Sequence, residues 1–400
     1  MKIIDGTIAS PLGFSADGLH AGFKKKKLDF GWIVSEVPAS VAGVYTTNKV
    51  IAAPLLVTKA SIQKSQKLQA IVVNSGIANS CTGQQGLDAA YEMQRLTAQK
   101  LEIEPDLVGL ASTGVIGEQL PMDALKNGLS QILVSGKAED FAEAILTTDT
   151  CTKTCVVTEE FGSDLVTMAG VAKGSGMIHP NMATMLSFIA TDAKVSQPIL
   201  QLMTQEIADE SFNTITVDGD TSTNDSFVIM ATGRCGQSEI DNTADPRYAQ
   251  LKALLGSLAL ELAQAIVRDG EGATKFITVE VQNAKTREEA RKVAYAVAHS
   301  PLVKTAFFAS DPNLGRLLAA VGYAGIEDLD VDALKMWLDD VLVAENGGRA
   351  ESYTEEAGQA VMNRPEITVR IDLQRGDTTA VVYTCDLSHE YVSINADYRS

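Results

Sequence analysis

The segment from Gly170 to Leu186 holds the densest group of reactive residue types in the chain. Three glycines fall within seven residues and are followed by His179-Pro180-Asn181, which predicts a shaped loop rather than the interior of a helix or strand. The order does not match a GxxxxGK[ST] phosphate loop, because Lys173 precedes the Gly-Ser-Gly run instead of closing it. The loop is therefore either a chemical site or a structural turn between two strands.

Thr184 is the candidate nucleophile of this segment. Threonine attacks well only with a base beside it, and one known solution uses the threonine's own free α-amine. The pKa of that amine is about 7.7 to 8, close to working pH, which suits a general base. An internal threonine gains a free amine only if the chain is cut directly before it, and the small Ala183 leaves room for that attack. The residues alone leave open that Thr184 is an ordinary strand residue.

The overall composition limits the classes of partner. Hydrophobic residues make up 45% and charged residues 21%, as in ordinary globular chains. A net charge of -18 repels nucleic acid and anionic lipid, so the basic run Lys24–Lys27 is interpreted as a solvated turn. No apolar stretch approaches the 18 or more residues that span a bilayer, and the N-terminus lacks the apolar core of a signal peptide. We expect a cytoplasmic protein without nucleic-acid or membrane partners.

The cysteines and histidines do not form a recognisable metal site. Five cysteines spread over 400 residues are typical of reduced thiols rather than a disulfide framework. Cys151 and Cys155 have no second pair or neighbouring histidine to complete four ligands, and the four histidines lie far apart. We expect no metal and no cofactor.

Helical and extended segments alternate along the chain. Apolar residues at helical spacing predict helices over residues 87–101, 124–133, 139–146, 199–211, 248–267 and 286–299. Strands are predicted over residues 69–73, 165–171, 227–231, 276–281, 366–373 and 378–384, the last two as a hairpin across Gly376-Asp377. A domain boundary is expected near residues 283–285. The pattern predicts mixed α and β layers with a smaller C-terminal domain.

The segment AKGSGMIHPNMATML, residues 172–186, resembles a segment of a known protein family. It resembles the self-cleavage site of the ornithine acetyltransferase family, the glutamate N-acetyltransferases of the cyclic arginine pathway. Further segments match the family in order along the chain: Gly43–Lys49, Ala52–Pro54, Val73–Asn79, Ser112–Gly117, Thr147–Thr150, Val217–Asp220, Asp269–Lys275, Leu302–Thr305, Asp311–Arg316 and Asn395–Ser400. So many ordered motifs exclude a chance match.

The resemblance implies an α+β fold, a layered α/β/β/α sandwich of the self-cleaving type. It implies a catalytic domain over residues 1–284 and a smaller α/β domain over residues 285–400 that contributes its terminus to the active site. The precursor would cut itself between Ala183 and Thr184 into an α chain and a β chain. Two of each would form a heterotetramer.

The resemblance also implies an activity. Thr184 would take the acetyl group from N-acetylornithine as an ester and pass it to glutamate, with Thr113 and Gly114 as the oxyanion hole. Substrate contacts would come from six residues: Thr147, Lys173, Thr184, Glu271, Asn395 and Ser400. Lys173 would supply the counter-charge for the substrate's α-carboxylate. On the residues alone, Thr113-Gly114 is a turn after an apolar strand and Glu271 is a solvated turn between two glycines.

Several alternatives stay open. Family members divide on whether acetyl-CoA is also a donor, and no motif in the chain decides this. An N-terminal-nucleophile amidohydrolase or aminopeptidase on a similar fold, which releases the acyl group to water, is the alternative enzyme. A non-enzymatic amino-acid-binding protein is the alternative outside enzymes. The chain departs from the family pattern in having Ser400 for the usual threonine and Leu314 for the usual tryptophan.

Overall fold

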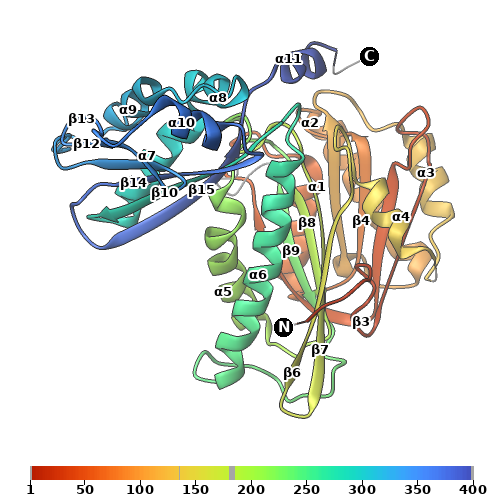
Figure 1. Cartoon of the computed structure of the whole chain (residues 1–400). Coiled ribbons are helices and arrows are strands. Elements are labelled where there is room, and N and C mark those ends of the chain that lie inside the picture. The colour runs from red at the N-terminus through yellow and green to blue at the C-terminus, as the bar shows by residue number, and fades with distance from the viewer. Residues whose placement is uncertain (1, 135, 180–184, 398–400) are drawn as a thin grey trace. The chain divides into compact units, whose positions relative to one another are not determined.

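The computed structural model describes residues 2–134, 136–179 and 185–397 (Figure 1). The chain divides into two compact units. The first contains residues 1–213 and 220–266, and the second contains residues 214–219 and 267–400. The boundary predicted between residues 284 and 285 coincides with the end of a strand of the second unit, β10 (Phe276–Ala284), and it stays a prediction.

The first unit is built on a nine-stranded mixed sheet in the order β1-β6-β7-β8-β9-β3-β4-β5, with β2 paired to β3. The strands are β1 (Lys2–Ile3), β2 (Phe14–Leu19), β3 (Phe30–Tyr45), β4 (Lys67–Ile77), β5 (Val108–Val115), β6 (Lys153–Phe161), β7 (Asp164–Lys173), β8 (Leu186–Thr191) and β9 (Ser226–Ala231).

The long strand β3 joins the two halves of this sheet. Its register with β4 shifts between Val34 and Ala39, so its first part pairs with β4 and its last part with β9. Such irregularities bend a strand. One apolar core collects side chains from β4, β7, β8 and β9, including Ile71, Val171 and Phe188, so the two halves face each other.

Helices cover the outer faces of both halves. A second apolar core packs β3, β4 and β5 against α1 (Ala53–Ser65), α2 (Gly83–Leu101) and α3 (Met122–Ser130). On the other half lie α5 (Gln197–Glu210) and α6 (Pro246–Arg268). A Cβ added at Gly170 of β7 would come within 2.5 Å of Leu258 of α6, so this glycine permits the close packing. The α/β/β/α layers confirm the predicted fold class.

Helix α6 corrects one expectation from the sequence. By length and composition alone it is apolar enough to cross a membrane, and 50% of its most apolar window is buried inside the structure. This differs from the expectation that no apolar stretch approaches that length. The helix carries Lys252 and Glu261 among its apolar residues and packs on β7, as a core helix does.

The second unit has a six-stranded sheet in the order β13-β12-β11-β14-β10-β15. Its strands after β10 are β11 (Lys335–Leu338), β12 (Val341–Glu345), β13 (Gly348–Arg349), β14 (Glu366–Asp372) and β15 (Thr378–Cys385). The helices are α7 (Arg287–His299), α8 (Pro301–Phe308), α9 (Leu314–Gly322), α10 (Glu355–Met362) and α11 (His389–Ala396).

The predicted hairpin of β14 and β15 is wrong. Both strands pair with β10, β14 in parallel and β15 antiparallel, so β10 lies between them. The connection passes over the end of β10, where the backbone N–H groups of Arg375 and Gly376 donate to the Asn283 carbonyl. The predicted turn at Gly376-Asp377 does connect the two strands. They are not neighbours in the sheet, because β10 lies between them.

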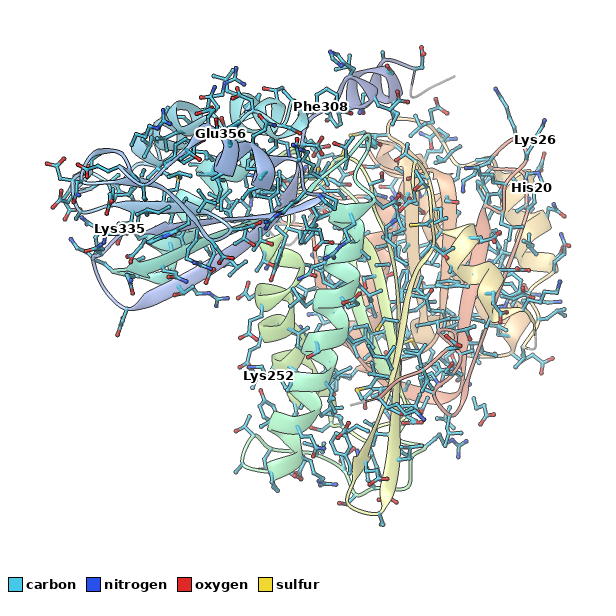
Figure 2. All side chains as sticks on the ribbon, in the orientation of Figure 1. His20, Lys26, Lys252, Phe308, Lys335 and Glu356 are labelled. Carbon is cyan, nitrogen blue, oxygen red and sulfur yellow. The ribbon has the colours of Figure 1, made fainter. Side chains whose placement is uncertain are left out.

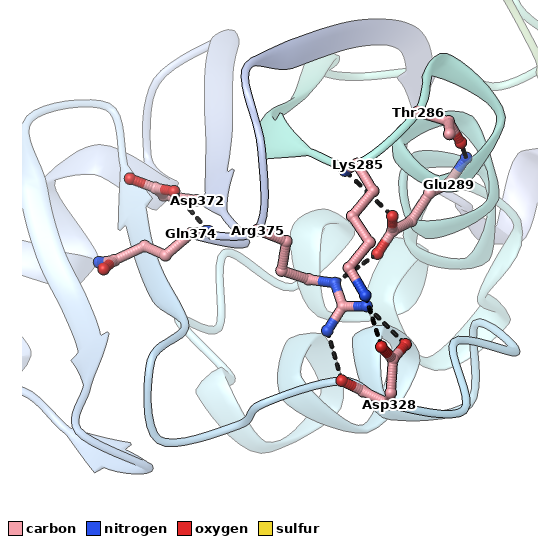
Figure 3. Close-up of polar contacts among 7 residues, drawn as sticks. All are labelled: Lys285, Thr286, Glu289, Asp328, Asp372, Gln374 and Arg375. Atoms are coloured by element: carbon pink, nitrogen blue, oxygen red, sulfur yellow. Dashed lines mark hydrogen bonds and ion pairs between the residues drawn. The ribbon is translucent and has the colours of Figure 1, made fainter.

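Arg375 fastens this connection (Figure 3). Its guanidinium donates to Glu289 at 2.6 Å and to Asp328 at 2.5 Å, and Lys285 donates to the other Asp328 oxygen at 2.5 Å. Thr286 caps α7 by accepting the Glu289 N–H at 3.1 Å. Glu289 thus joins the start of α7 to the connection that leads into β15.

Candidate functional site

The glycine-rich segment is the connection between two paired strands. β7 ends at Lys173, and β8 begins at Leu186, its antiparallel partner in register. Gly170 to Lys173 are therefore strand, and the loop begins only at Gly174, which corrects the expectation of a loop throughout. Pro180 to Thr184, including Ala183, lie outside the described residues. The buried Met185 stands directly after them.

Lys173 and Thr113 meet in the first unit. The Lys173 ammonium, buried at the end of β7, donates to the Thr113 hydroxyl oxygen at 3.0 Å. Thr113 lies near the end of β5 and is itself buried. Two residues that are 60 positions apart in the sequence are thereby brought into direct contact.

Gly114 is held where only glycine fits. It lies within β5 opposite Gly76 of β4, and its φ is 128°. A Cβ on Gly114 would lie 2.2 Å from the Gly76 carbonyl carbon, which no real side chain tolerates. The interpretation of Thr113-Gly114 as a turn after the strand is therefore wrong, because both residues continue β5 with an irregular backbone.

Two asparagines fix the strand end that carries Thr113. The Ser112 hydroxyl donates to Asn74 Oδ1 at 2.5 Å. Asn224, just before β9, donates from its Nδ2 to the carbonyls of Ser112 at 2.8 Å and Ala78 at 2.6 Å. All of these side chains are buried. The position of Thr113 is thus set by hydrogen bonds from both neighbouring segments.

Asp149 connects a third segment, which contains Thr147, to the beginning of the loop after Lys173. Its carboxylate accepts hydrogen bonds from the Lys153 ammonium at 2.7 Å, the Gly174 N–H at 2.7 Å and the Thr147 N–H at 3.0 Å. Burial would raise the pKa of Asp149, but the charges of Lys173 and Lys153 and these hydrogen bonds lower it to about 2. Asp149 is therefore a buried carboxylate that ties Thr147 to the beginning of the loop.

Sequence reasoning missed the role of Asp149 as well as that of Lys24. Asp149 lies in the Thr147–Thr150 segment that matches the family and is four residues from Lys153, but neither observation shows that it is buried. Lys24 is half-buried and donates to the carbonyl of Leu146, directly before Thr147, at 2.6 Å. Burial lowers the pKa of Lys24 to about 8 against the opposing charge of Asp29, and Lys173 lowers it further. The expectation of a solvated turn holds for the exposed Lys26, which extends from the ribbon in Figure 2, but not for Lys24.

The second unit holds the other predicted contacts. Glu271, in the turn after α6, is buried rather than solvated. Its carboxylate accepts a hydrogen bond from Asn395 Nδ2 on α11 at 2.7 Å. The α11 segment also binds this turn through Ser388, whose hydroxyl donates to the Gly272 carbonyl at 2.6 Å. The chain end is thus anchored as far as α11, and Ser400 lies outside the described residues.

Metal-ligand clusters and disulfides are absent from the part of the chain that the structure describes. Within residues 2–134, 136–179 and 185–397, no three His, Cys, Asp or Glu side chains gather as ligands for an ion. All five cysteines are free thiols, with Cys81 and Cys151 exposed and Cys385 buried.

The chain is similar to known proteins over most of its length. The model of the ArgJ family matches residues 15–400. A Streptococcus thermophilus protein named arginine biosynthesis bifunctional protein ArgJ is 58% identical over 100% of both chains. The protein of the same name from Neisseria meningitidis serogroup A is 63% identical over 95% of this chain and 94% of its own. A crystal structure of the Bacillus halodurans protein of that name, 52% identical, covers 46% of this chain and 97% of its own, with a TM-score of 0.43.

Proposed function

Because this chain belongs to the ArgJ family, it is a glutamate N-acetyltransferase of arginine biosynthesis, and we propose that it carries the acetyl group as an ester on Thr184. The reaction moves the acetyl group from N2-acetyl-L-ornithine to L-glutamate and gives L-ornithine and N-acetyl-L-glutamate. Self-cleavage between Ala183 and Thr184 would supply the α-amine that acts as the base. Support comes from the position of this segment in a connection between paired strands.

The contact between Lys173 and Thr113 carries the catalytic part of the proposal. An ammonium group can only donate hydrogen bonds, so the Thr113 oxygen accepts from Lys173 and keeps its own hydroxyl hydrogen for another acceptor. Both half-reactions pass through a tetrahedral oxyanion, which needs such a donor. We assign this role to the Thr113 hydroxyl and the backbone at Gly114. One donor of this kind typically contributes about 3 to 4 kcal/mol to transition-state stabilisation.

Thr113→Ala is expected to lower kcat by about 10²- to 10³-fold and to leave KM for N-acetylornithine nearly unchanged. The reason is that the oxyanion exists only in the transition state. Steady-state kinetics with both substrates measure the effect. Thr113→Ser, which keeps the hydroxyl, is the matched control and should retain most of the activity. A rise in KM alone would place Thr113 in ground-state binding instead.

The substrate contacts that we propose are the residues that the family resemblance implies. Lys173 offers a buried cation to the α-carboxylate shared by ornithine and glutamate. Asp149 accepts the backbone N–H groups of both Thr147 and Gly174, the residue after Lys173. Glu271 offers a buried carboxylate to the ammonium group of ornithine, and it is oriented by Asn395. Ser400 and the Thr184 hydroxyl complete the set.

The covalent intermediate predicts ping-pong kinetics. Ornithine must leave before glutamate attacks, so double-reciprocal plots at several glutamate concentrations should be parallel. Enzyme incubated with N-acetylornithine alone and denatured in acid should gain one acetyl group on the β chain, as intact mass measurement would show. Intersecting lines without this adduct would mean direct transfer, and release of acetate without N-acetylglutamate would favour the amidohydrolase alternative.

The donor, the assembly and the location of the enzyme complete the proposal. The names of the relatives call those proteins bifunctional, and acetyl-CoA is the second donor that we propose for this chain. An assay of purified protein with each donor separately decides it. We also propose a cytoplasmic heterotetramer of two α and two β chains, which native mass measurement tests.

A further inference from the structure

Lys24 is a half-buried cation to which the proposed reaction gives no role. The loop that carries it turns around Asp29, whose buried carboxylate accepts three backbone N–H groups of the loop. These belong to Ala21 at 2.6 Å, Gly22 at 3.1 Å and Lys24 at 2.8 Å. Three hydrogen bonds to one carboxylate fix the backbone from which the Lys24 side chain extends.

The aliphatic stem of Lys24 passes over the end of β4. A Cβ added at Gly76 would lie 3.2 Å from Lys24 Cγ and 3.0 Å from the Phe23 carbonyl oxygen. Gly76 is the residue of β4 that pairs with Gly114 of β5, directly after Thr113. Glycine at position 76 thus lets Lys24 lie against the strand ends that carry the proposed oxyanion hole.

The Lys24 ammonium donates to two backbone carbonyls. One belongs to Leu28 in its own loop, at 3.0 Å, and the other belongs to Leu146, at 2.6 Å. The Leu146 carbonyl and the Thr147 N–H are parts of the same peptide group, and that N–H donates to Asp149 at 3.0 Å. A cation therefore holds one edge of this peptide group and a carboxylate holds the other. Hydrogen bonds to charged groups are the strong ones, so both restrain the backbone that leads into Thr147.

Asp149 extends this set of contacts toward Lys173. The same carboxylate accepts the N–H of Gly174, the residue after Lys173, at 2.7 Å. The backbone at Thr147 is thus tied to Lys24 on one side and, through Asp149, to the end of β7 on the other. Lys24 is the only cation among these residues whose ammonium binds the Thr147 segment directly.

We propose that Lys24 is a positioning residue of the transferase, which orients Thr147 toward the substrate by holding the Leu146 carbonyl. This inference rests on the proposed function, in which Thr147 is a substrate contact. There Thr147 binds the substrate and not the developing oxyanion, so its contact is equally strong in the ground state and the transition state. Loss of Lys24 should therefore raise KM and change kcat little.

Lys24→Met tests this role, because methionine keeps an unbranched apolar stem and lacks the ammonium group. KM for N-acetylornithine should rise about 10- to 100-fold, the usual effect of losing a hydrogen bond to a charged group. Lys26→Met is the matched control, since it removes an equal charge from an exposed position of the same loop. Its KM should stay at the wild-type value. An equal rise in both variants would reveal a general effect of surface charge and would overturn the proposal.

A double-variant cycle shows whether Lys24 acts through Thr147. In a Thr147→Ala background the contact that Lys24 positions is already lost, so Lys24→Met should raise KM by less than about 3-fold. A rise as large as that in the wild-type background would mean that Lys24 acts independently of Thr147 and would overturn the proposal. The thermal midpoint of unfolding of each variant checks its fold.

The pH dependence of KM gives a test that does not need Lys24→Met to fold. Burial lowers the pKa of Lys24 to about 8. The charges of Lys173 and Lys27 act in the same direction, and those of Asp29 and Asp149 act against it. Lys24 is therefore charged below this pH and neutral above it, so its hydrogen bond to the Leu146 carbonyl weakens as the pH rises.

Lys24→Arg isolates this titration, because arginine stays charged at every pH used. Every other titrating group of the enzyme and the substrate is common to both proteins and cancels in the ratio of their KM values. The ratio of the wild-type KM to the KM of Lys24→Arg should rise severalfold as the pH passes through about 8. A constant ratio across this range overturns the proposal.

Failure of this inference differs from failure of the proposed function. If Thr147→Ala raises KM but Lys24→Met leaves it unchanged, Thr147 stays a substrate contact and the inference alone is overturned. If Thr147→Ala leaves KM unchanged, Thr147 is no substrate contact, and both the proposed contact and the role of Lys24 are overturned.

Discussion

Thr184→Ala is expected to yield one uncut 42.5 kDa chain without transferase activity. In the proposed mechanism the hydroxyl first attacks the Ala183 carbonyl and then carries the acetyl group, so both functions should end together. Loss of a nucleophile of this kind lowers kcat on the order of 10⁶-fold. Intact mass measurement and N-terminal sequencing check the result, since wild type should show a second fragment that begins Thr-Met-Leu.

Thr184→Ser is the control for this experiment. Serine keeps the hydroxyl and loses only a methyl group, so cleavage and transfer should both persist. An active wild-type enzyme that is a single uncut chain would contradict the mechanism, because no free α-amine would then exist at residue 184.

Asp149→Ala is expected to destabilise the first unit by about 3 to 5 kcal/mol. Removal of one member of a buried ion pair typically has this cost, because the partner charge stays buried without compensation. Here both Lys153 and Lys173 would lose the carboxylate, as would the Gly174 N–H. The side chains of Asp149 and Lys153 are 0% and 1% exposed, so solvent does not replace the lost interaction.

Urea unfolding followed by tryptophan fluorescence measures this effect. The chain has two tryptophans, and a Trp337→Phe background leaves the buried Trp32 of the first unit as the reporter. The double variant Asp149→Ala with Lys153→Met should cost less than the sum of the two single variants, since they share one interaction. Additive effects would mean that the pair is not coupled in stability.

The sequence correctly predicted several helices and strands that can be recognised from the spacing of apolar residues within a short segment. The helix over residues 248–267 and the strands over residues 165–171 and 227–231 correspond to α6, β7 and β9. The resemblance predicted the residues of the site, and the structure joins two of these pairs directly, Lys173 with Thr113 and Glu271 with Asn395. Their catalytic roles stay predictions.

What the sequence missed depends on contacts between distant segments. Glu271 was interpreted as solvated because only two glycines flank it, and the helix that covers it comes from 124 residues later in the chain. Asp149 is one acidic residue among many in an acidic chain, and its four-residue spacing from Lys153 does not by itself mark it as buried. The insertion of β10 between β14 and β15 likewise has no signature in the turn that joins them.

The order of strands in the first unit has a consequence for the life of the processed enzyme. β8 and β9 follow the proposed cut, yet they lie between β7 and β3, which precede it. Strands of the β chain would thus lie between strands of the α chain. Backbone hydrogen bonds would join β8 to β7 on one side and β9 to β3 on the other. The precursor forms these ladders within one chain, whereas separated fragments would have to find each other in dilute solution. The mature protein would then be metastable, able to persist for as long as it stays folded but unable to recover once its chains part.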